Sequence, residues 1–254
     1  MILSSPAKSM RLFDSHTHLQ FSQFDLDREA VISRARAAGV IGMINVGTDL
    51  TTSQQALALA EAHDDMWATV GLHPTDTDQE FNKTEFTKLA QHPKVVAIGE
   101  CGLDYFRTAE TKDQQKEIFN QQIELARLVN KPLMIHCRNA YDDLLVVVKN
   151  FPGVRGNLHF FAGDWLIAKE FLDLGFTLSL AGPITFTNQY DEVIINTPLE
   201  GLLVETDAPF AAPAPYRGRR NEPSYVAEMA RRVAQLKGLT VETVAEATIK
   251  TASR

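Results

Sequence analysis

The sequence contains few cysteines and no long apolar run. Its two cysteines, Cys101 and Cys137, are too few for a disulfide framework in a chain of 254 residues, so we expect both to be reduced. No stretch approaches the ~18 apolar residues of a membrane helix, and residues 1–9 lack the apolar segment of a secretory signal. These absences predict a cytoplasmic protein that makes no contact with a membrane.

Positive charge is also scarce. The 25 Lys and Arg residues are outnumbered by 32 Asp and Glu residues, and the net charge of −7 argues against a broad basic surface that grips nucleic acid along its backbone. A small local phosphate site is compatible with this balance. The glycine-rich turns that cradle nucleotides, GxGxxG and GxxxxGK followed by Ser or Thr, do not follow the first predicted strand. A nucleotide-binding open sheet therefore has no support.

Short β-branched or apolar runs alternate with longer amphipathic segments along the chain. A period of two predicts strands for the runs, and a period near 3.6 predicts helices for segments such as 26–39, 51–63, 111–129 and 139–150. The predicted strands are 11–19, 40–48, 66–74, 94–105, 132–138, 156–163, 176–184 and 201–209. Eight strand–helix units in about 250 residues favour a (β/α)8 TIM barrel over a doubly wound open sheet. We expect one domain over 10–254, preceded by an extension at 1–9.

Residues of metal-ligand type fall at the ends of five predicted strands, where a barrel of this kind carries its active site. Strand alternation would place His16 and His18 on one face, with Asp14 a layer deeper on the same side. By the same alternation, Cys101 and Cys137 point outward and pack under the helices. The strand-end residues are His16, His18, Glu100, Asp104, His136, His159 and Asp207.

Polar groups inside a closed barrel are costly to bury unless they are paired or bind a metal. Four histidines and two carboxylates with few nearby cations therefore predict a divalent metal, and they offer more ligands than one tetrahedral ion uses. A two-metal centre with one bridging carboxylate accommodates them. Two such ions, about 3.5–4 Å apart, activate water for hydrolysis. Imidazole ligands favour Zn, Mn or Fe over Mg.

Other acids and histidines have assignable roles. Asp207 could also accept the proton of the attacking water, whereas Glu205, on the same strand face, either orients a ligand or is a buried structural carboxylate. His73 ends the third predicted strand, and we expect it to contact substrate rather than merely cap the strand. His63 and His92 lie where helices should end, and a protonated imidazole suits that position.

Arginines are concentrated in the loops that follow the predicted strand ends. On an acidic chain this local reversal of charge favours a phosphate ester over a neutral amide, because guanidinium groups bind phosphate through two parallel hydrogen bonds. Some of them could instead pair with loop acids such as Glu222. The arginines are Arg107, Arg138, Arg217, Arg219 and Arg220. We take Arg107, Arg138 and Arg217 as the candidate phosphate-binding residues.

The motifs FDSHTHL, VGLHP, GECGLDYFR, HCR, HFFAG and LVETDAPFAAPAPYRGRRNEP resemble those of the TatD family of metal-dependent deoxyribonucleases, from Met10 to about residue 250. The resemblance implies an amidohydrolase-like barrel with two ions. One ion would be held by His16, His18 and Asp207, the other by His136 and His159, with Glu100 bridging. It further implies that Asp207 is the general base, that His73 lies by the substrate phosphate, and that Mg²⁺ is a usable cofactor beside Zn and Mn.

Two departures from the family pattern stand out. Phe160 follows His159 where the family often has cysteine or another small residue, and strand alternation would point this side chain outward. The last helical segment reads TIKTASR, without the asparagine and the Arg-Leu-Phe ending typical of the family. None of the expected ligands is missing.

The sequence therefore predicts a hydrolase of DNA phosphodiester bonds that acts on ends or single strands through metal-activated water. One alternative is a metallohydrolase of small cyclic amides, lactones or phosphotriesters, which the arginines disfavour. The other is a non-catalytic metal-binding module, which would have little need for both Glu100 and Asp207. We expect a monomer by default, because no heptad or apolar dimer stripe stands out.

Overall fold

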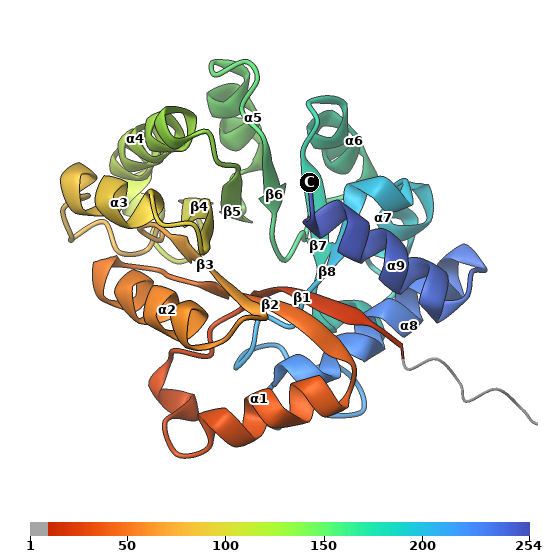
Figure 1. Ribbon diagram of the computed structural model, residues 1–254. Helices are drawn as coiled ribbons and strands as arrows, with labels where there is room; N and C mark the ends of the chain where they lie inside the picture. Colours follow the sequence, from red (N-terminus) through yellow and green to blue (C-terminus); the bar gives the residue numbers. More distant parts are fainter. Residues whose placement is uncertain (1–9) are drawn as a thin grey trace, which may run out of the picture.

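Eight parallel strands form the centre of the protein, in the order β1 to β8 around a barrel (Figure 1). The computed structural model describes residues 10–254, so the predicted extension at 1–9 lies outside the described residues. The TIM-barrel prediction is confirmed. The strands are β1 (Leu12–Thr17), β2 (Val40–Val46), β3 (Met66–Val70), β4 (Val95–Asp104), β5 (Leu133–Arg138), β6 (Gly156–Leu158), β7 (Thr177–Leu180) and β8 (Leu202–Val204).

Helices surround the strands (Figure 1). The longest, α4, buries Ile118, Phe119 and Ile123 and exposes its polar side, as its apolar periodicity predicts. The α-helices are α1 (Arg28–Ala37), α2 (Leu50–Ala62), α3 (Lys83–Ala90), α4 (Lys112–Val129), α5 (Tyr141–Lys149), α6 (Trp165–Asp173), α7 (Asp191–Asn196), α8 (Val226–Lys237) and α9 (Val241–Ala252). Short 3-10 helices are η1 (Ser22–Phe24), η2 (Ala109–Thr111), η3 (Gly182–Thr185), η4 (Leu199–Gly201) and η5 (Pro223–Tyr225). None of the helices within residues 10–254 is long and apolar enough to cross a bilayer.

The barrel closes between β1 and the segment that follows β8. Thr17 forms an isolated parallel bridge with Ala208. The backbone N–H of His18 donates to Ala208 O at 2.8 Å, and that of Asp207 donates to His16 O at 2.9 Å. The closure therefore brings the first and last motifs of the sequence together at the carboxyl end of the strands.

The apolar core lies mainly between strands and helices. Both cysteines are buried in this cluster and are free thiols, as predicted. A second, smaller cluster from β2, β4 and β5 consists of Ile44, Val46, Ala97 and Met134.

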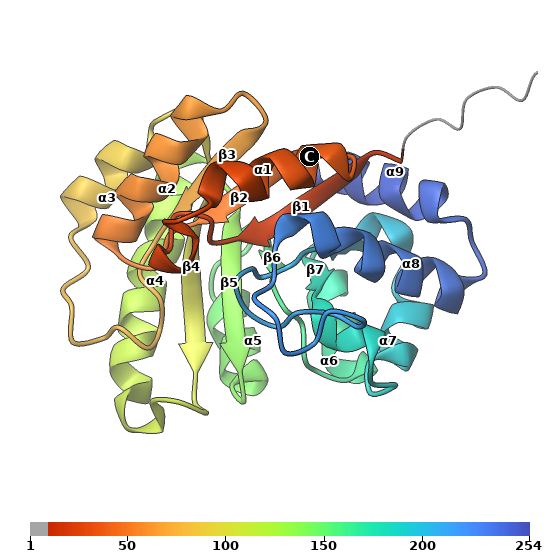
Figure 2. The ribbon, with the colours of Figure 1, turned by 90° about the horizontal axis from the view of Figure 1, so that it is seen from below.

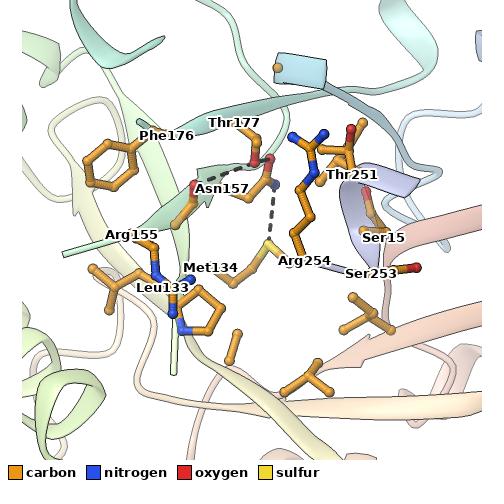
Figure 3. A pocket seen from close by; sticks show the side chains of 18 of the residues that line it. Ser15, Leu133, Met134, Arg155, Asn157, Phe176, Thr177, Thr251, Ser253 and Arg254 are labelled. Atoms are coloured by element: carbon orange, nitrogen blue, oxygen red, sulfur yellow. Dashed lines mark hydrogen bonds between the residues drawn. The ribbon is translucent and has the colours of Figure 1, made fainter. Parts of the chain in front are cut away.

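A cavity of about 820 Å³ lies at the amino ends of the strands. Figure 3 shows Leu133, Met134 and Asn157 beside it, with Arg254 reaching in from the end of the chain. In Figure 2 the arrowheads of β4 and β5 point downward, whereas α9 and the C terminus lie at the upper end. None of the predicted metal ligands lines this cavity. This cavity and the predicted site therefore occupy opposite ends of the barrel.

Glycines let β4 pass closely beside β5 on either side of Glu100. Gly99 has a φ of 154°, and a Cβ there would overlap the carbonyl oxygen of Met134 and lie 2.7 Å from its side chain. Gly102 has a φ of 127°, and a Cβ there would overlap the carbonyl oxygen of His136. Side chains other than hydrogen are excluded at both positions.

We predict that Gly99→Ala lowers the free energy of unfolding by about 2–5 kcal/mol, the sum of backbone strain and overpacking. Gly175→Ala is the matched control, because Gly175 also has a positive φ of 86° but no neighbour within 4 Å of the added Cβ. Its loss should be about 1–2 kcal/mol. Urea unfolding of both variants measures the difference; equal losses would contradict the close approach of β4 to β5.

Candidate metal centre

The six predicted metal ligands converge at the carboxyl end of the barrel. His16, Glu100 and His136 lie within β1, β4 and β5. The other three lie just beyond the strands to which the sequence assigned them, because β1, β6 and β8 end at Thr17, Leu158 and Val204. These three are His18, His159 and Asp207. Half of the ligand set is thus carried by the loops that follow the strands.

Four donor atoms form the first group of candidate ligands. His16 Nε2 lies 3.1 Å from His18 Nε2. Asp207 Oδ1 is 3.7 and 3.4 Å from these two atoms, and Glu100 Oε2 is 3.5 and 3.7 Å from them. Donor atoms around a tetrahedral ion with bonds of about 2.0–2.1 Å are about 3.3–3.4 Å apart. The four atoms therefore have the spacing of one coordination shell.

The second group uses the other oxygen of Glu100. Its Oε1 lies 3.1 Å from His136 Nδ1 and 2.8 Å from His159 Nε2. The two ring nitrogens are 3.3 Å apart. Since one carboxylate oxygen faces each group, Glu100 has the geometry of a bridging ligand.

Outer partners hold three of the four histidine rings. His18 Nδ1 donates to Val46 O at 2.7 Å. His136 Nε2 is 3.0 Å from Asp104 Oδ2, and His159 Nδ1 is 3.3 Å from Glu205 Oε1. Such contacts fix the tautomer and leave the opposite nitrogen free as a ligand. His16 Nδ1, in contrast, has no hydrogen-bond partner among residues 10–254.

The two outer carboxylates are themselves held by further hydrogen bonds. Asp104 accepts the N–H groups of Phe106 and Arg107 at 3.0 and 2.8 Å. Glu205 accepts the N–H of Phe160 at 2.8 Å and the hydroxyl of Ser179. Of the two roles left open for Glu205, the structure places it in contact with a candidate ligand. Asp104, which the sequence grouped with the ligands, contacts the outer side of His136.

One expectation from strand alternation is wrong, and another rests on an alternation that does not extend far enough along the chain. Asp14 does not lie beneath His16 on a shared face: β1 is irregular between Asp14 and Thr17, and Asp14 instead accepts the N–H and hydroxyl of Thr206 at 2.8 and 2.5 Å. Phe160 lies beyond the end of β6 with a φ of 46°. Strand alternation therefore does not decide where its side chain points.

Burial and charge set the protonation of the cluster. Burial alone would raise the pKa of Glu100, but the neighbouring His159, His73 and His136 hold it well below its usual value. Burial, and then the positive charge of His159, lowers the pKa of His16 to about 3. Glu100 is thus ionised and His16 neutral at pH 7, which are the forms that bind a cation. Burial lowers the pKa of His159, but the charge of Glu100 outweighs it and holds this pKa well above its usual value, so His159 must release a proton when it binds an ion.

His73 joins the cluster from the loop after β3. Its Nε2 lies 3.3 Å from Glu100 Oε1. Its Nδ1 accepts the backbone N–H of Thr75 at 3.2 Å and lies 2.7 Å from the Thr75 hydroxyl, which can donate to the same nitrogen. Burial lowers the pKa of His73, so the ring is neutral and carries its single proton on Nε2. A protonated Nε2 donates hydrogen bonds and cannot ligate a metal, although His73, Glu100 and His136 are close enough to form a candidate site.

The five arginines of the mouth differ in their partners. Arg220 pairs with Asp27 at 2.7 Å. The expected loop acid, Glu222, instead pairs at 2.6 Å with Arg34 on α1. Arg107 lies 4.0 Å from Asp104, and within residues 10–254 no carboxylate lies within 4.0 Å of the remaining three, Arg138, Arg217 and Arg219.

His63 and His92 lie at helix ends away from the cluster, as predicted. His63 is the residue that ends α2 and lies 3.5 Å from Glu29. His92 follows α3 and lies 3.1 Å from Glu61. Both contacts are on the outer layer of the barrel.

We predict that Glu100→Gln lowers the metal content of the purified protein to at most one ion per chain. Because a ligand that binds only the folded state stabilises it, a chelator should lower the Tm of the wild type by more than that of Glu100→Gln. Atomic absorption and thermal unfolding measure both effects. Glu228→Gln, on the surface of α8, is the control; the same metal content in all three proteins would contradict the bridge.

Known proteins resemble this chain in sequence over most of its length. The chain matches the family described as "TatD related DNase" over residues 13–254. It is 43% identical over 249 residues to "Uncharacterized metal-dependent hydrolase YabD" of Bacillus subtilis, which covers 96% of this chain and 98% of that relative. It is 38% identical over 241 residues to "3'-5' ssDNA/RNA exonuclease TatD" of Klebsiella pneumoniae, which covers 89% of this chain and 90% of that relative.

Solved structures agree with the sequence relatives. The crystal structure of YJJV, a TatD homolog from Escherichia coli K12, superposes with a TM-score of 0.90 at 30% identity, covering 96% of this chain and 97% of the other. The match extends over nearly all of the barrel and includes the segments that carry the candidate ligands. The chain belongs to the TatD family of metal-dependent hydrolases.

Proposed function

We propose that the protein hydrolyses phosphodiester bonds of DNA, at ends or in single strands, with two divalent ions. The observation that carries this proposal is the buried Glu100 carboxylate, which faces one group of ligands with each oxygen. The name of the Klebsiella relative, an exonuclease of single-stranded DNA and RNA, supports a nucleic-acid substrate. The name of the Bacillus relative specifies only a metal-dependent hydrolase.

The donor set fits two ions. His16, His18, Asp207 and one oxygen of Glu100 would hold the first, and His136, His159 and the other oxygen would hold the second. Bound ions would supply Lewis acids that polarise the phosphate and acidify water. Imidazole-rich shells favour Zn or Mn, and Mg stays the third choice.

Asp207 and His73 have complementary roles in this proposal. Asp207 lies at the rim of the cluster, fixed by the hydrogen bond from its N–H to His16 O, and its carboxylate accepts the proton of the attacking water. His73 carries its proton on Nε2, which faces the cluster. This N–H donates to an oxygen of the substrate phosphate, where negative charge increases in the transition state.

The exposed arginines bind the phosphates of the substrate. Arg138 is the last residue of β5, and Arg107 and Arg217 follow β4 and β8, all at the end of the barrel that carries the candidate ligands. Among residues 10–254 no carboxylate lies within 4.0 Å of Arg138 or Arg217, so the charge of these two groups is available to a ligand, which suits a diester with a formal negative charge. A neutral lactone or amide would gain nothing from these groups. A cytoplasmic location and a monomeric state stay predictions.

We predict metal-dependent release of nucleotides from end-labelled single-stranded oligonucleotides. Glu100→Ala, which lacks the bridging carboxylate, should release nucleotides at least about 100-fold more slowly than the wild type, since both ions lose a ligand. Circular dichroism checks that this variant is folded. No release with Mg²⁺, Mn²⁺, Co²⁺ or Zn²⁺ would overturn the proposal and turn attention to lactones and phosphotriesters, or to a non-catalytic module. Equal rates in both proteins would identify a contaminating nuclease.

We predict that His73→Ala lowers kcat/KM on DNA by roughly 10²–10³-fold, the effect of losing one hydrogen-bond donor to the transition state. Metal content should not change, because Nε2 is a donor and not a ligand. His73→Gln, which keeps an N–H group, should recover part of the rate. Loss of one ion from His73→Ala would instead assign His73 to the metal shell.

A further inference from the structure

Three phenylalanines are exposed, and all three follow the carboxyl ends of strands. Phe106, Phe210 and Phe186 have 60%, 47% and 42% of their surface exposed. They lie in the loops after β4, β8 and β7, at the end of the barrel that carries the metal ligands. The other exposed large apolar residues within 10–254 are aliphatic. Exposed phenyl rings are thus confined to the loops around the mouth.

Two of these rings are paired with arginines. The guanidinium carbon of Arg138 lies 4.0 Å from the centre of the Phe106 ring, and that of Arg217 lies 4.1 Å from the centre of the Phe186 ring. Neither arginine has a carboxylate of residues 10–254 within 4.0 Å. Because the rings remain exposed, each pair presents a flat apolar surface beside an uncompensated positive charge. This combination matches a nucleotide, which joins a flat base to an anionic phosphate.

The third ring connects this surface to the metal centre. The rings of Phe210 and His18 are centred 6.2 Å apart, and Phe21 stacks on His18 at 4.5 Å. Phe210 also meets Phe21 edge-on at 6.2 Å. A base that contacts Phe210 would therefore belong to a nucleotide whose phosphate lies near the candidate ligand His18.

We propose that the Phe106–Arg138 pair, the Phe186–Arg217 pair and Phe210 are binding subsites for unstacked bases of a single-stranded nucleic acid. The inference rests on the proposed phosphodiesterase function and names the residues that would hold the bases of its substrate. Bases within a duplex stack on one another and offer no free face, whereas those of a single strand or frayed end can stack on aromatic side chains. The subsites therefore select unpaired strands, with little dependence on base identity.

The test compares oligonucleotides of one length that carry bases, lack them as abasic sites, or form a duplex. For the wild type, KM and Kd should be about 5- to 100-fold lower for the base-bearing single strand than for the abasic strand. Phe106→Ala and Phe186→Ala should each weaken only the base-bearing substrate. Phe106→Tyr should keep the preference, and Phe106→Leu, which retains bulk without an aromatic face, should lose it.

Leu166→Ala, which removes an exposed apolar side chain on the outer helix α6, is the matched control and should change nothing. Equal affinity of the wild type for base-bearing and abasic strands, or a preference for duplex, would overturn the inference. Cleavage of any of the three substrates would still support the proposed function. Failure to cleave all three would count against the proposed function. In that case, fluorescence anisotropy with the same labelled strands still tests the subsites, and the absence of a base-dependent difference would refute them.

Discussion

The arrangement of this protein depends on one buried carboxylate, that of Glu100. An ionised acid inside a barrel requires opposite charge or a metal, because burial without compensation costs several kcal/mol. Here the two oxygens face His16 and His18 on one side and His136 and His159 on the other. The histidines hold the carboxyl pKa low despite burial. The negative charge of Glu100 is unfavourable to bury without partners, and the same charge attracts the two cations that the cluster could hold.

The backbone around Glu100 holds its carboxylate between the two groups of histidines. Gly99 and Gly102 allow β4 to approach β5 without a clash, and the N–H of Glu100 donates to Gly47 O at 2.7 Å. Farther out, Asp104 and Glu205 hold the rings of His136 and His159 from behind. Ligands that are held by a rigid strand on one side and by a carboxylate on the other lose little entropy when they bind an ion.

The mouth of the barrel reverses the overall charge of the chain. A protein with a net charge of −7 repels a long polyanion, yet Arg138 and Arg217 lie there without carboxylate partners within 4.0 Å among residues 10–254. Both instead lie over exposed phenyl rings. Such a surface can engage a few nucleotides at short range, where local contacts outweigh the screened field of the distant acids. The candidate metal ligands lie on the strands and on the residues just beyond them, and the exposed phenyl rings lie in the loops of the same end of the barrel.

The sequence by itself determined the barrel and which residues are the candidate metal ligands. Alternation of strand and helix periods is local information, and His16, Glu100 and His136 fall where those periods place strand ends. The resemblance of the motifs then implied which ligands share an ion. Only the tertiary structure decided that Asp104 supports His136 and that Asp14 turns to Thr206.

The partners of the arginines and the tautomer of His73 were also decided by the tertiary structure. Glu222 pairs with Arg34, a residue 188 positions away, and not with an arginine of its own loop. The backbone N–H of Thr75 donates to His73 Nδ1, which leaves the ring proton on Nε2. The spacing of apolar residues along the chain does not predict this contact. Contacts of this kind depend on packing between distant segments and on loop backbone geometry. Local patterns establish which groups are present, and the folded chain establishes which groups meet.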